Sequence, residues 1–349
     1  MKVHIVSPDI REGDAVGNHC IYLAQALRQA GVETALYAKR HDSPAEPVFS
    51  LESLVETCGA EDVLLLSFST FQPQLPALLR LPCRKIVYFH GVTPVDLLLD
   101  QDPVAAYWSS KALLQVPQLM RCDTLIANSH WNLEDLLKHF EQRPGSERLD
   151  VIPPITPDLP IFRESLREQP KGDPFEVIVV GRVAPHKKIE WAIEMIAQLG
   201  NKGLNAHLRI IGSSHNGHYL SLLRATSERL HLQNRVHFDG QVSQADLINA
   251  FRHASALLVT SEHEGFCIPV LEAMHMGLPA LVRTGTAASE VGGDAVAGFT
   301  TVAEGVEALQ RLIQEPGLRD AMVKSGRRKA AEWLEHASPG NWLKQLSTD

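Results

Sequence analysis

The chain has 349 residues, a formal net charge of -8, 44% hydrophobic residues and 21% charged residues. This composition is typical of a folded globular protein and excludes disordered and fibrous classes. Neither the first 157 residues nor the remainder has a surplus of Lys and Arg, so the charge pattern does not predict nucleic-acid binding. The length is sufficient for two domains that each bury a core.

Membrane-spanning and secreted classes are also not predicted. No apolar run approaches the roughly 20 residues that a spanning helix requires. The N-terminal MKVHIVSPDI is typical of a buried first strand and lacks the apolar core of a signal peptide. The five cysteines are scattered and never form C-x-x-C. We therefore expect a cytoplasmic protein with free thiols and no zinc framework.

Short β-branched runs alternate with helical patterns through the first half of the chain. This alternation predicts βα units and a parallel sheet that is covered on both faces. The first expected helix spans residues 16–30. The expected strands lie at residues 2–7, 33–38, 62–68, 85–90, 123–129 and 149–153.

The proline-rich stretch from Pro153 to Pro174 interrupts the alternation and predicts a linker. A second βα series follows it, so we expect an α/β protein with two doubly wound Rossmann-like domains, residues 1–157 and 170–332. Ligands of such sheets bind beyond the carboxyl ends of the strands, which predicts a site in a cleft between facing strand ends. The expected strands lie at residues 175–181, 207–212, 235–240, 255–260 and 279–284, and the expected helices at 191–199 and 245–254.

The stretch SEHEGFCIPVLEAMHMGLPAL, residues 261–281, follows one of these strands. Pro269 suits the first position of a helix, which Gly277 would end. Amides at such a helix start form a nest suited to anions and hydroxyl oxygens. Glu264 before the nest and Glu272 inside the helix could bind the two ends of one elongated ligand. A turn role for Glu264 and a helix-dipole role for Glu272 are the alternative.

A second candidate lies in GRVAPHKKIEW, residues 181–191. Arg182 follows the end of an expected strand, and Lys187 stands five residues later at the entry to a helix. Two cations beside a helix start would suit a diphosphate, and a solvated loop is the alternative. For Lys188 we prefer the solvated loop.

Histidines and aspartates supply the remaining candidates. His90 closes a strand, where it serves either as a structural residue or as a ligand contact. A group of three aspartates is interpreted as helix caps rather than a metal site. The pattern around Glu272 does not supply a complete metal-ligand set, so no metal is expected. Cys267 is interpreted as a packing residue. The three aspartates are Asp96, Asp100 and Asp102.

The motif E-G-F-C-I-P-V-L-E, with G-R-V-x-P-x-K roughly 80 residues before it, resembles the retaining GT-B glycosyltransferases of family 4. These enzymes transfer a sugar from a nucleotide donor. In the first half, GDAVGNH, YFHGVTP and DTLIANSHWNLEDL are similar to a branch that assembles bacterial polysaccharide and lipopolysaccharide. The resemblance covers nearly the whole chain, with its more specific motifs in the second half.

The resemblance implies a role for each candidate. Arg182 and Lys187 would hold the donor diphosphate, Glu264 the hydroxyls of the donor sugar, and Glu272 the ribose. His90 would lie near the donor sugar. The other implied donor contacts are Gly17, Gly181, Gly212, Val242, Gly265, Phe266, Cys267 and Ile268.

Two departures from the family pattern bear on these roles. Lys188 stands where the family usually has glycine, so the family pattern does not determine the backbone conformation of that loop. The first loop reads REGDAVGN instead of carrying a Gly-Gly pair, so acceptor binding differs from the usual pattern.

The resemblance also implies the reaction and its partners. It implies a hexosyltransferase that needs no metal cofactor and uses a UDP- or GDP-linked sugar, with retention by front-face attack. The acceptor would be a glycan or a lipid-linked molecule bound by the first domain, and a C-terminal helix at about 333–349 would pack back on that domain. The segment 105–120 is either a core helix or a peripheral membrane contact.

Other function classes remain as alternatives. They are a nucleotide-sugar epimerase of the same architecture, a non-catalytic nucleotide-binding protein and a glycoside hydrolase. A dinucleotide oxidoreductase is disfavoured because the first strand is not followed by G-x-G-x-x-G.

Overall fold

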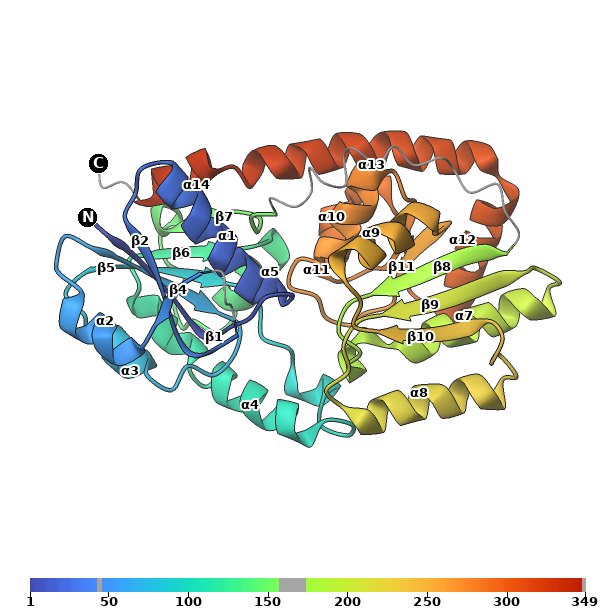
Figure 1. Cartoon of the computed structure of the whole chain (residues 1–349), viewed down its shortest axis with the longest axis horizontal. Helices are drawn as coiled ribbons and strands as arrows, with labels where there is room; N and C mark the ends of the chain where they lie inside the picture. Colours follow the sequence, from blue (N-terminus) through green and yellow to red (C-terminus); the bar gives the residue numbers. More distant parts are fainter. Residues whose placement is uncertain (43–45, 157–173, 347–349) are drawn as a thin grey trace. The chain divides into compact units, whose positions relative to one another are not determined.

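The computed structural model describes residues 1–42, 46–156 and 174–346, which form two compact units (Figure 1). The first unit comprises Met1–Val95, Val104–Pro157 and Leu334–Asp349, and the second comprises Asp96–Pro103 and Asp158–Trp333. Both contain one parallel sheet with helices on its two faces, so the expected pair of Rossmann-like domains is confirmed. The expected linker lies mostly outside the described residues. Its first part includes Ile155, which is buried in the core of the first unit.

The strands of the first unit are buried on both faces because nearly every position is apolar. In β4 (Val63–Phe68), Val63 and Leu65 contribute to one core, and Leu64 and Leu66 to the other. This division follows from the period of two along a strand. The other elements are β1 (Val3–Ile10), α1 (Ala15–Gln29), β2 (Thr34–His41), β3 (Val48–Phe49), α2 (Leu51–Thr57), α3 (Leu75–Leu78), β5 (Arg84–Phe89), α4 (Pro103–Leu113), β6 (Thr124–Ala127), α5 (His130–Leu137), β7 (Leu149–Val151) and α14 (Pro339–Leu346).

The second unit repeats this layered arrangement. Its helices α7 and α8 lie on one face of the sheet, and α9 and α10 lie on the other (Figure 1). The elements are β8 (Phe175–Val180), α7 (Ile189–Asn201), β9 (Ala206–Ile211), α8 (Gly217–Arg229), β10 (Val236–Gly240), α9 (Gln244–His253), β11 (Ala256–Val259), α10 (Ile268–Met276), β12 (Ala280–Arg283), α11 (Ala287–Gly292), β13 (Ala297–Phe299), α12 (Val302–Gln314) and α13 (Pro316–His336).

The strand order places a topological switch point in each sheet. The first sheet runs β3-β2-β1-β4-β5-β6-β7 and the second β10-β9-β8-β11-β12-β13, with every recorded pairing parallel. The order reverses between β1 and β4 and again between β8 and β11. Loops that leave two such neighbouring strands diverge, which opens a crevice at the carboxyl ends.

The C-terminal segment differs from the single helix expected at about 333–349. Helix α13 ends at His336, and α14 begins at Pro339. Proline restricts the residue before it and lacks an amide hydrogen, so it favours a break at Ser338. Trp342 and Leu346 of α14 are buried in the core of the first unit, where α14 lies beside α1 (Figure 1).

The segment 105–120 has both buried and exposed apolar residues. Ala112, Val116 and Leu119 belong to the core of the first unit, whereas Tyr107 and Trp108 are 52% and 46% exposed. Core packing therefore accounts for one face of the segment only. None of the helices in the described ranges has the length and apolar character needed to cross a bilayer.

The ends of β8 and β9 approach so closely that only glycine fits at position 212. Gly212 has a φ of +150°, and a Cβ there would lie 1.9 Å from the carbonyl oxygen of Gly181. We expect Gly212→Ala to lower the free energy of unfolding by about 2 kcal/mol or more, because the clash is with backbone. Urea or thermal denaturation measures the change.

The matched control is Gly217→Ala, because a Cβ at Gly217 meets nothing within 4 Å. This variant should be as stable as the wild-type protein or slightly more so. Equal denaturation midpoints for the Gly212 and Gly217 variants would contradict the close approach.

Candidate functional site

The candidate site is a pocket at the switch point of the second sheet. Its lining comes from two loops and the strands that lead into them. The first loop follows β8 and carries Arg182 and Lys187, and the second follows β11 and carries Ser261 and Glu264. The residues that line the pocket are Val179, Val180, Gly181, Arg182, Lys187, Ile189, Leu258, Val259, Thr260, Ser261 and Glu264. The structure thus brings three of the predicted catalytic residues into one pocket.

Two hydrogen bonds to backbone carbonyl groups join these two loops. The hydroxyl of Thr260 donates to the carbonyl oxygen of Lys187 at 2.7 Å. The amide of Glu262 donates to the carbonyl oxygen of His186 at 2.8 Å. The loop after β11 therefore holds the backbone at His186 and Lys187, in addition to the contact made by the Lys187 side chain.

The side chains of Lys187 and Glu264 form an ion pair across the loops. Lys187 Nζ lies 2.7 Å from Glu264 Oε1, and the hydroxyl of Ser261 donates to the same oxygen at 2.6 Å. The side chain of Lys187 is 20% exposed and that of Glu264 is 9% exposed. A carboxylate this buried requires charged or hydrogen-bonded partners, and these two contacts supply them.

The start of α10 presents the expected run of backbone amides. Cys267, the N-cap, has a φ of +77°, and α10 begins at Ile268, so Pro269 occupies the second helical position rather than the first. Phe266 is buried and contacts the ring of Trp333 edge-on, with centroids 5.3 Å apart. Burial, followed by the neighbouring Glu264 carboxylate, raises the pKa of the Cys267 thiol well above its usual value. This favours the packing interpretation of Cys267.

Lys188 keeps a backbone shape that glycine would adopt easily. Its φ and ψ are 48° and 43°, in the left-handed region. Its Nζ lies 3.7 Å from Glu190 and 3.5 Å from Glu262, and Glu262 also pairs with Arg283 at 2.9 Å. The guanidinium of Arg283 lies 4.2 Å from the ring centroid of Trp191. Lys188 is therefore part of a charged network and not a simple solvated loop residue.

The other predicted donor contacts of the second unit lie at the same edge of the sheet. Gly181 and Gly212 directly follow β8 and β9, and Val242 follows β10. Gly265 precedes the start of α10, and the partly exposed Glu272 is the fifth residue of that helix.

His90 and Gly17 belong to the first unit. His90 follows β5 and is buried, with Nε2 2.8 Å from the hydroxyl of Ser67. Burial lowers the pKa of His90 to about 3, so its imidazole is neutral at physiological pH. Gly17 lies in the first turn of α1, where a Cβ would meet the carbonyl oxygen of Arg11 at 2.2 Å. Gly17 therefore has a steric role, whatever else it contacts.

Sequence reasoning missed the residues that hold the ion pair in place. Thr260 and Ser261 directly follow β11, but hydroxyl residues are common at such positions, and their partners lie more than 70 residues away or in a turn. It also missed His186, which is buried behind Lys187. Burial, with smaller contributions from Lys187 and Arg182, lowers the pKa of His186 well below its usual value. The neutral imidazole adds no third positive charge.

These features define what the pocket can bind. Two basic side chains in the lining favour a diphosphate, and the start of α10, which follows the lining residue Glu264 in the chain, adds positive potential. The Glu264 carboxylate favours a ligand that donates hydrogen bonds, such as a sugar with vicinal hydroxyls. The arrangement therefore suits a molecule that carries both groups.

Comparison with known proteins agrees with this chemistry. Residues 162–329 match the family model described as "Glycosyl transferases group 1". The matched residues make up slightly less than half of the chain, and they include Lys187 and Glu264.

Two curated relatives show a partial similarity. One is the mannosylfructose-phosphate synthase of Agrobacterium fabrum, 27% identical over 172 residues, or 46% of this chain and 37% of the relative. The other is the D-inositol 3-phosphate glycosyltransferase of Rhodococcus jostii, 27% identical over 238 residues, or 62% of this chain and 51% of the relative. The chain thus spans about a third to a half of the length of these relatives.

Solved structures match the fold over almost the whole chain. WaaG, a glycosyltransferase involved in lipopolysaccharide biosynthesis, aligns with a TM-score of 0.74 at 18% identity, covering 99% of this chain and 100% of that one. HepE of Anabaena, in complex with UDP and glucose, aligns with a TM-score of 0.76 at 17% identity, covering 99% and 98%. The fold is therefore that of the GT-B glycosyltransferases.

The buried His90 predicts a pH dependence of stability. Its pKa is about 3 when folded and about 6.5 when unfolded. Because the unfolded chain takes up the proton first, stability falls as pH drops from 6.5 towards 3. Between pH 7 and pH 5, wild type should lose about 2 kcal/mol more than His90→Gln, measured by urea denaturation. Equal losses in the two proteins would mean that His90 is not buried as described.

The conformation of Lys188 predicts an unusual substitution pattern. Lys188→Gly removes the left-handed strain and the ion pairs, whereas Lys188→Ala removes only the ion pairs. We expect the glycine variant to be more stable than the alanine variant by about 1 kcal/mol. Denaturation midpoints measure this difference, and the opposite order would show that residue 188 does not adopt the left-handed conformation.

Proposed function

We propose that the chain is a retaining GT-B glycosyltransferase of family 4 that transfers a hexose from a nucleotide-diphosphate sugar. The Lys187–Glu264 pair at the β8–β11 switch point is the observation that carries this proposal. One loop supplies a cation for the diphosphate, and the other supplies a carboxylate for sugar hydroxyls. Arg182 lines the same pocket and would be the second cation.

The donor is proposed to be UDP- or GDP-linked. A UDP-containing structure of HepE, with the same fold, supports a nucleoside diphosphate. In the proposed complex the amides of Gly265 to Ile268 bind the donor, and Glu272 accepts hydrogen bonds from the ribose. Gly212 and Val242 lie at the same edge of the sheet and would border the nucleoside.

The proposed reaction breaks the bond between the anomeric carbon and the diphosphate oxygen. Negative charge grows on the leaving diphosphate, where Arg182 and Lys187 would stabilise it by electrostatic preorganisation. The acceptor hydroxyl attacks from the same face, and its proton passes to the leaving phosphate, so configuration is retained. These cations are proposed to do this without a metal cofactor.

The first unit is proposed to bind the acceptor, a growing glycan or a lipid-linked glycan in polysaccharide or lipopolysaccharide assembly. Neutral His90, which is proposed to lie near the donor sugar, can accept or donate a hydrogen bond, which suits a sugar hydroxyl better than a phosphate. The exposed Tyr107 and Trp108 support peripheral membrane contact for a lipid-linked acceptor. A cytoplasmic location is part of this proposal.

The test is a thermal-shift panel with UDP, GDP, ADP and TDP, followed by turnover of the matching sugar nucleotides. Transfer to an added acceptor with retained anomeric configuration would support the proposal. Conversion of the donor sugar without acceptor would indicate an epimerase. Nucleotide binding without turnover under any acceptor condition would indicate a binding protein, and hydrolysis of oligosaccharide without donor would indicate a glycoside hydrolase.

Substitution of the ion pair should abolish most transfer. We expect Lys187→Ala and Glu264→Ala each to lower kcat/KM about 10- to 100-fold, the equivalent of one charge-assisted hydrogen bond. Steady-state kinetics with the donor identified above measure this loss, and circular dichroism checks that both variants fold.

The control is Lys202→Ala at the C-terminal end of α7, where the lysine side chain donates a hydrogen bond to Gln310 Oε1, away from the pocket. This variant should keep wild-type kinetics. Wild-type turnover in folded Lys187→Ala or Glu264→Ala would remove the assignment.

A further inference from the structure

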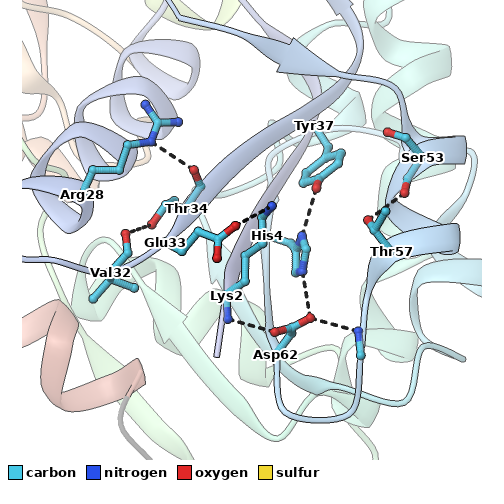
Figure 2. Close-up of polar contacts among 11 residues, drawn as sticks. Lys2, His4, Arg28, Val32, Glu33, Thr34, Tyr37, Ser53, Thr57 and Asp62 are labelled. Carbon is cyan, nitrogen blue, oxygen red and sulfur yellow. Dashed lines mark hydrogen bonds and ion pairs between the residues drawn. The ribbon is translucent and has the colours of Figure 1, made fainter.

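A second cluster of polar side chains lies in the first unit, at the amino ends of the strands. His4 is the second residue of β1, Cys58 follows α2, and Asp62 immediately precedes β4. The potential ligand atoms of these three residues all lie within 4.8 Å of one another. Figure 2 shows His4 between Tyr37 and Asp62.

We propose that His4, Cys58 and Asp62 bind a zinc-class divalent cation, with Cys83 as the fourth ligand. One imidazole nitrogen, one carboxylate oxygen and two sulfurs form a mixed donor set that suits Zn²⁺. Such a set is unsuited to Ca²⁺ or Mg²⁺, which take oxygen ligands.

The carboxylate of Asp62 is held in place before any cation binds. Its Oδ1 accepts a hydrogen bond from the amide of Lys2 at 2.8 Å, and its Oδ2 accepts one from the amide of Gly59 at 2.9 Å. Figure 2 shows these contacts converging on Asp62. Fixed carboxylates of this kind lower the entropic cost of assembling a metal site.

Both imidazole nitrogens of His4 have a polar neighbour. Its Nδ1 lies 3.1 Å from the hydroxyl of Tyr37, and its Nε2 lies 3.3 Å from Asp62 Oδ2. With Nδ1 protonated and bonded to Tyr37, the lone pair of Nε2 is directed towards the carboxylate. A cation between the two would satisfy both groups, as in metal sites whose histidine is oriented by its other nitrogen.

The alternative is a His4–Asp62 hydrogen bond without a metal, with the proton on His4 Nε2. A proton and a metal cation would occupy the same position between His4 Nε2 and the Asp62 carboxylate, so the two states exclude each other. The side chain of His4 is fully buried, so its contacts with Tyr37 and Asp62 are shielded from solvent.

The register of the sheet places Cys83 near Asp62. Val63 of β4 pairs with Arg84 of β5, so the residues just before them, Asp62 and Cys83, are also neighbours. Cys58 packs against the core that contains Cys83, and both thiols are free in the structure.

The proposed site departs from the expectation that the chain holds no metal. The spacing of the ligands in the sequence could not predict this site, because they lie near the starts of strands that come together only in the folded protein. Within the first unit it lies at the sheet edge opposite to His90, which follows the carboxyl end of β5. A cation there would join β1, α2, β4 and β5 and have a structural role.

The test is titration of the full-length protein with Co²⁺ after removal of bound metal by EDTA and exchange into a phosphine reductant. We expect one equivalent of Co²⁺ to bind with thiolate-to-cobalt charge-transfer absorption and tetrahedral d–d bands, and Zn²⁺ to displace it. Zn²⁺ should also raise the thermal unfolding midpoint. No binding, or binding without the charge-transfer band, would overturn the proposal.

Two substitutions assign the ligands, and one serves as a control. Cys58→Ser should remove at least half of the charge-transfer absorption and weaken binding tenfold or more, and Asp62→Asn should weaken it similarly. Cys122→Ser, another buried cysteine of the same unit, should leave the spectrum unchanged. An unchanged spectrum in Cys58→Ser would overturn the site, and one in Cys83→Ser would overturn the fourth ligand. The titrations use no nucleotide, so they are independent of the proposed transferase activity.

Discussion

The ion pair between Lys187 and Glu264 is the interaction on which the candidate site depends. Two largely buried charges are costly unless each satisfies the other, so neither loop can move independently without exposing or isolating a charge. The hydroxyls of Ser261 and Thr260 add hydrogen bonds on either side of the pair. The result is a positive group and a negative group at fixed separation, which the proposed binding of a phosphorylated sugar would use.

The two units share a strand order over six strands, but they carry different chemistry beyond the carboxyl ends of these strands. At the switch point of the second sheet the side chains are charged. In the first unit, His90 follows β5 and lies near His19 of α1, with ring centroids 5.5 Å apart, and burial is the main cause that lowers both pKa values. Neutral imidazoles can bind hydroxyls but do not attract phosphate. Under the proposed function, this division of charge would place the phosphorylated donor on the second unit and a neutral glycan on the first.

Much of the fold could be predicted because each central strand is buried on both faces and reads as a continuous apolar run. The proximity of Lys187 and Glu264 also followed from strand ends that meet at one edge of a parallel sheet. The Lys187–Glu264 pair itself and its bonds to Thr260 and Ser261 did not, because they depend on loop conformation. The break at Ser338 was missed although Pro339 signals it, because the helical pattern on either side is strong.

Lys188 shows why the loop conformation was the hardest part to predict. A left-handed lysine costs about 1–2 kcal/mol relative to glycine, and an exposed ion pair returns at most about 1 kcal/mol. One pair is not enough, but Lys188 lies near two carboxylates, and one of them is held by Arg283 on Trp191. A network of this kind loses less entropy per contact than isolated pairs, since each side chain is already restrained by another. The charged residues around Lys188 can therefore offset the strain and hold the neighbouring Lys187 in the pocket without a glycine.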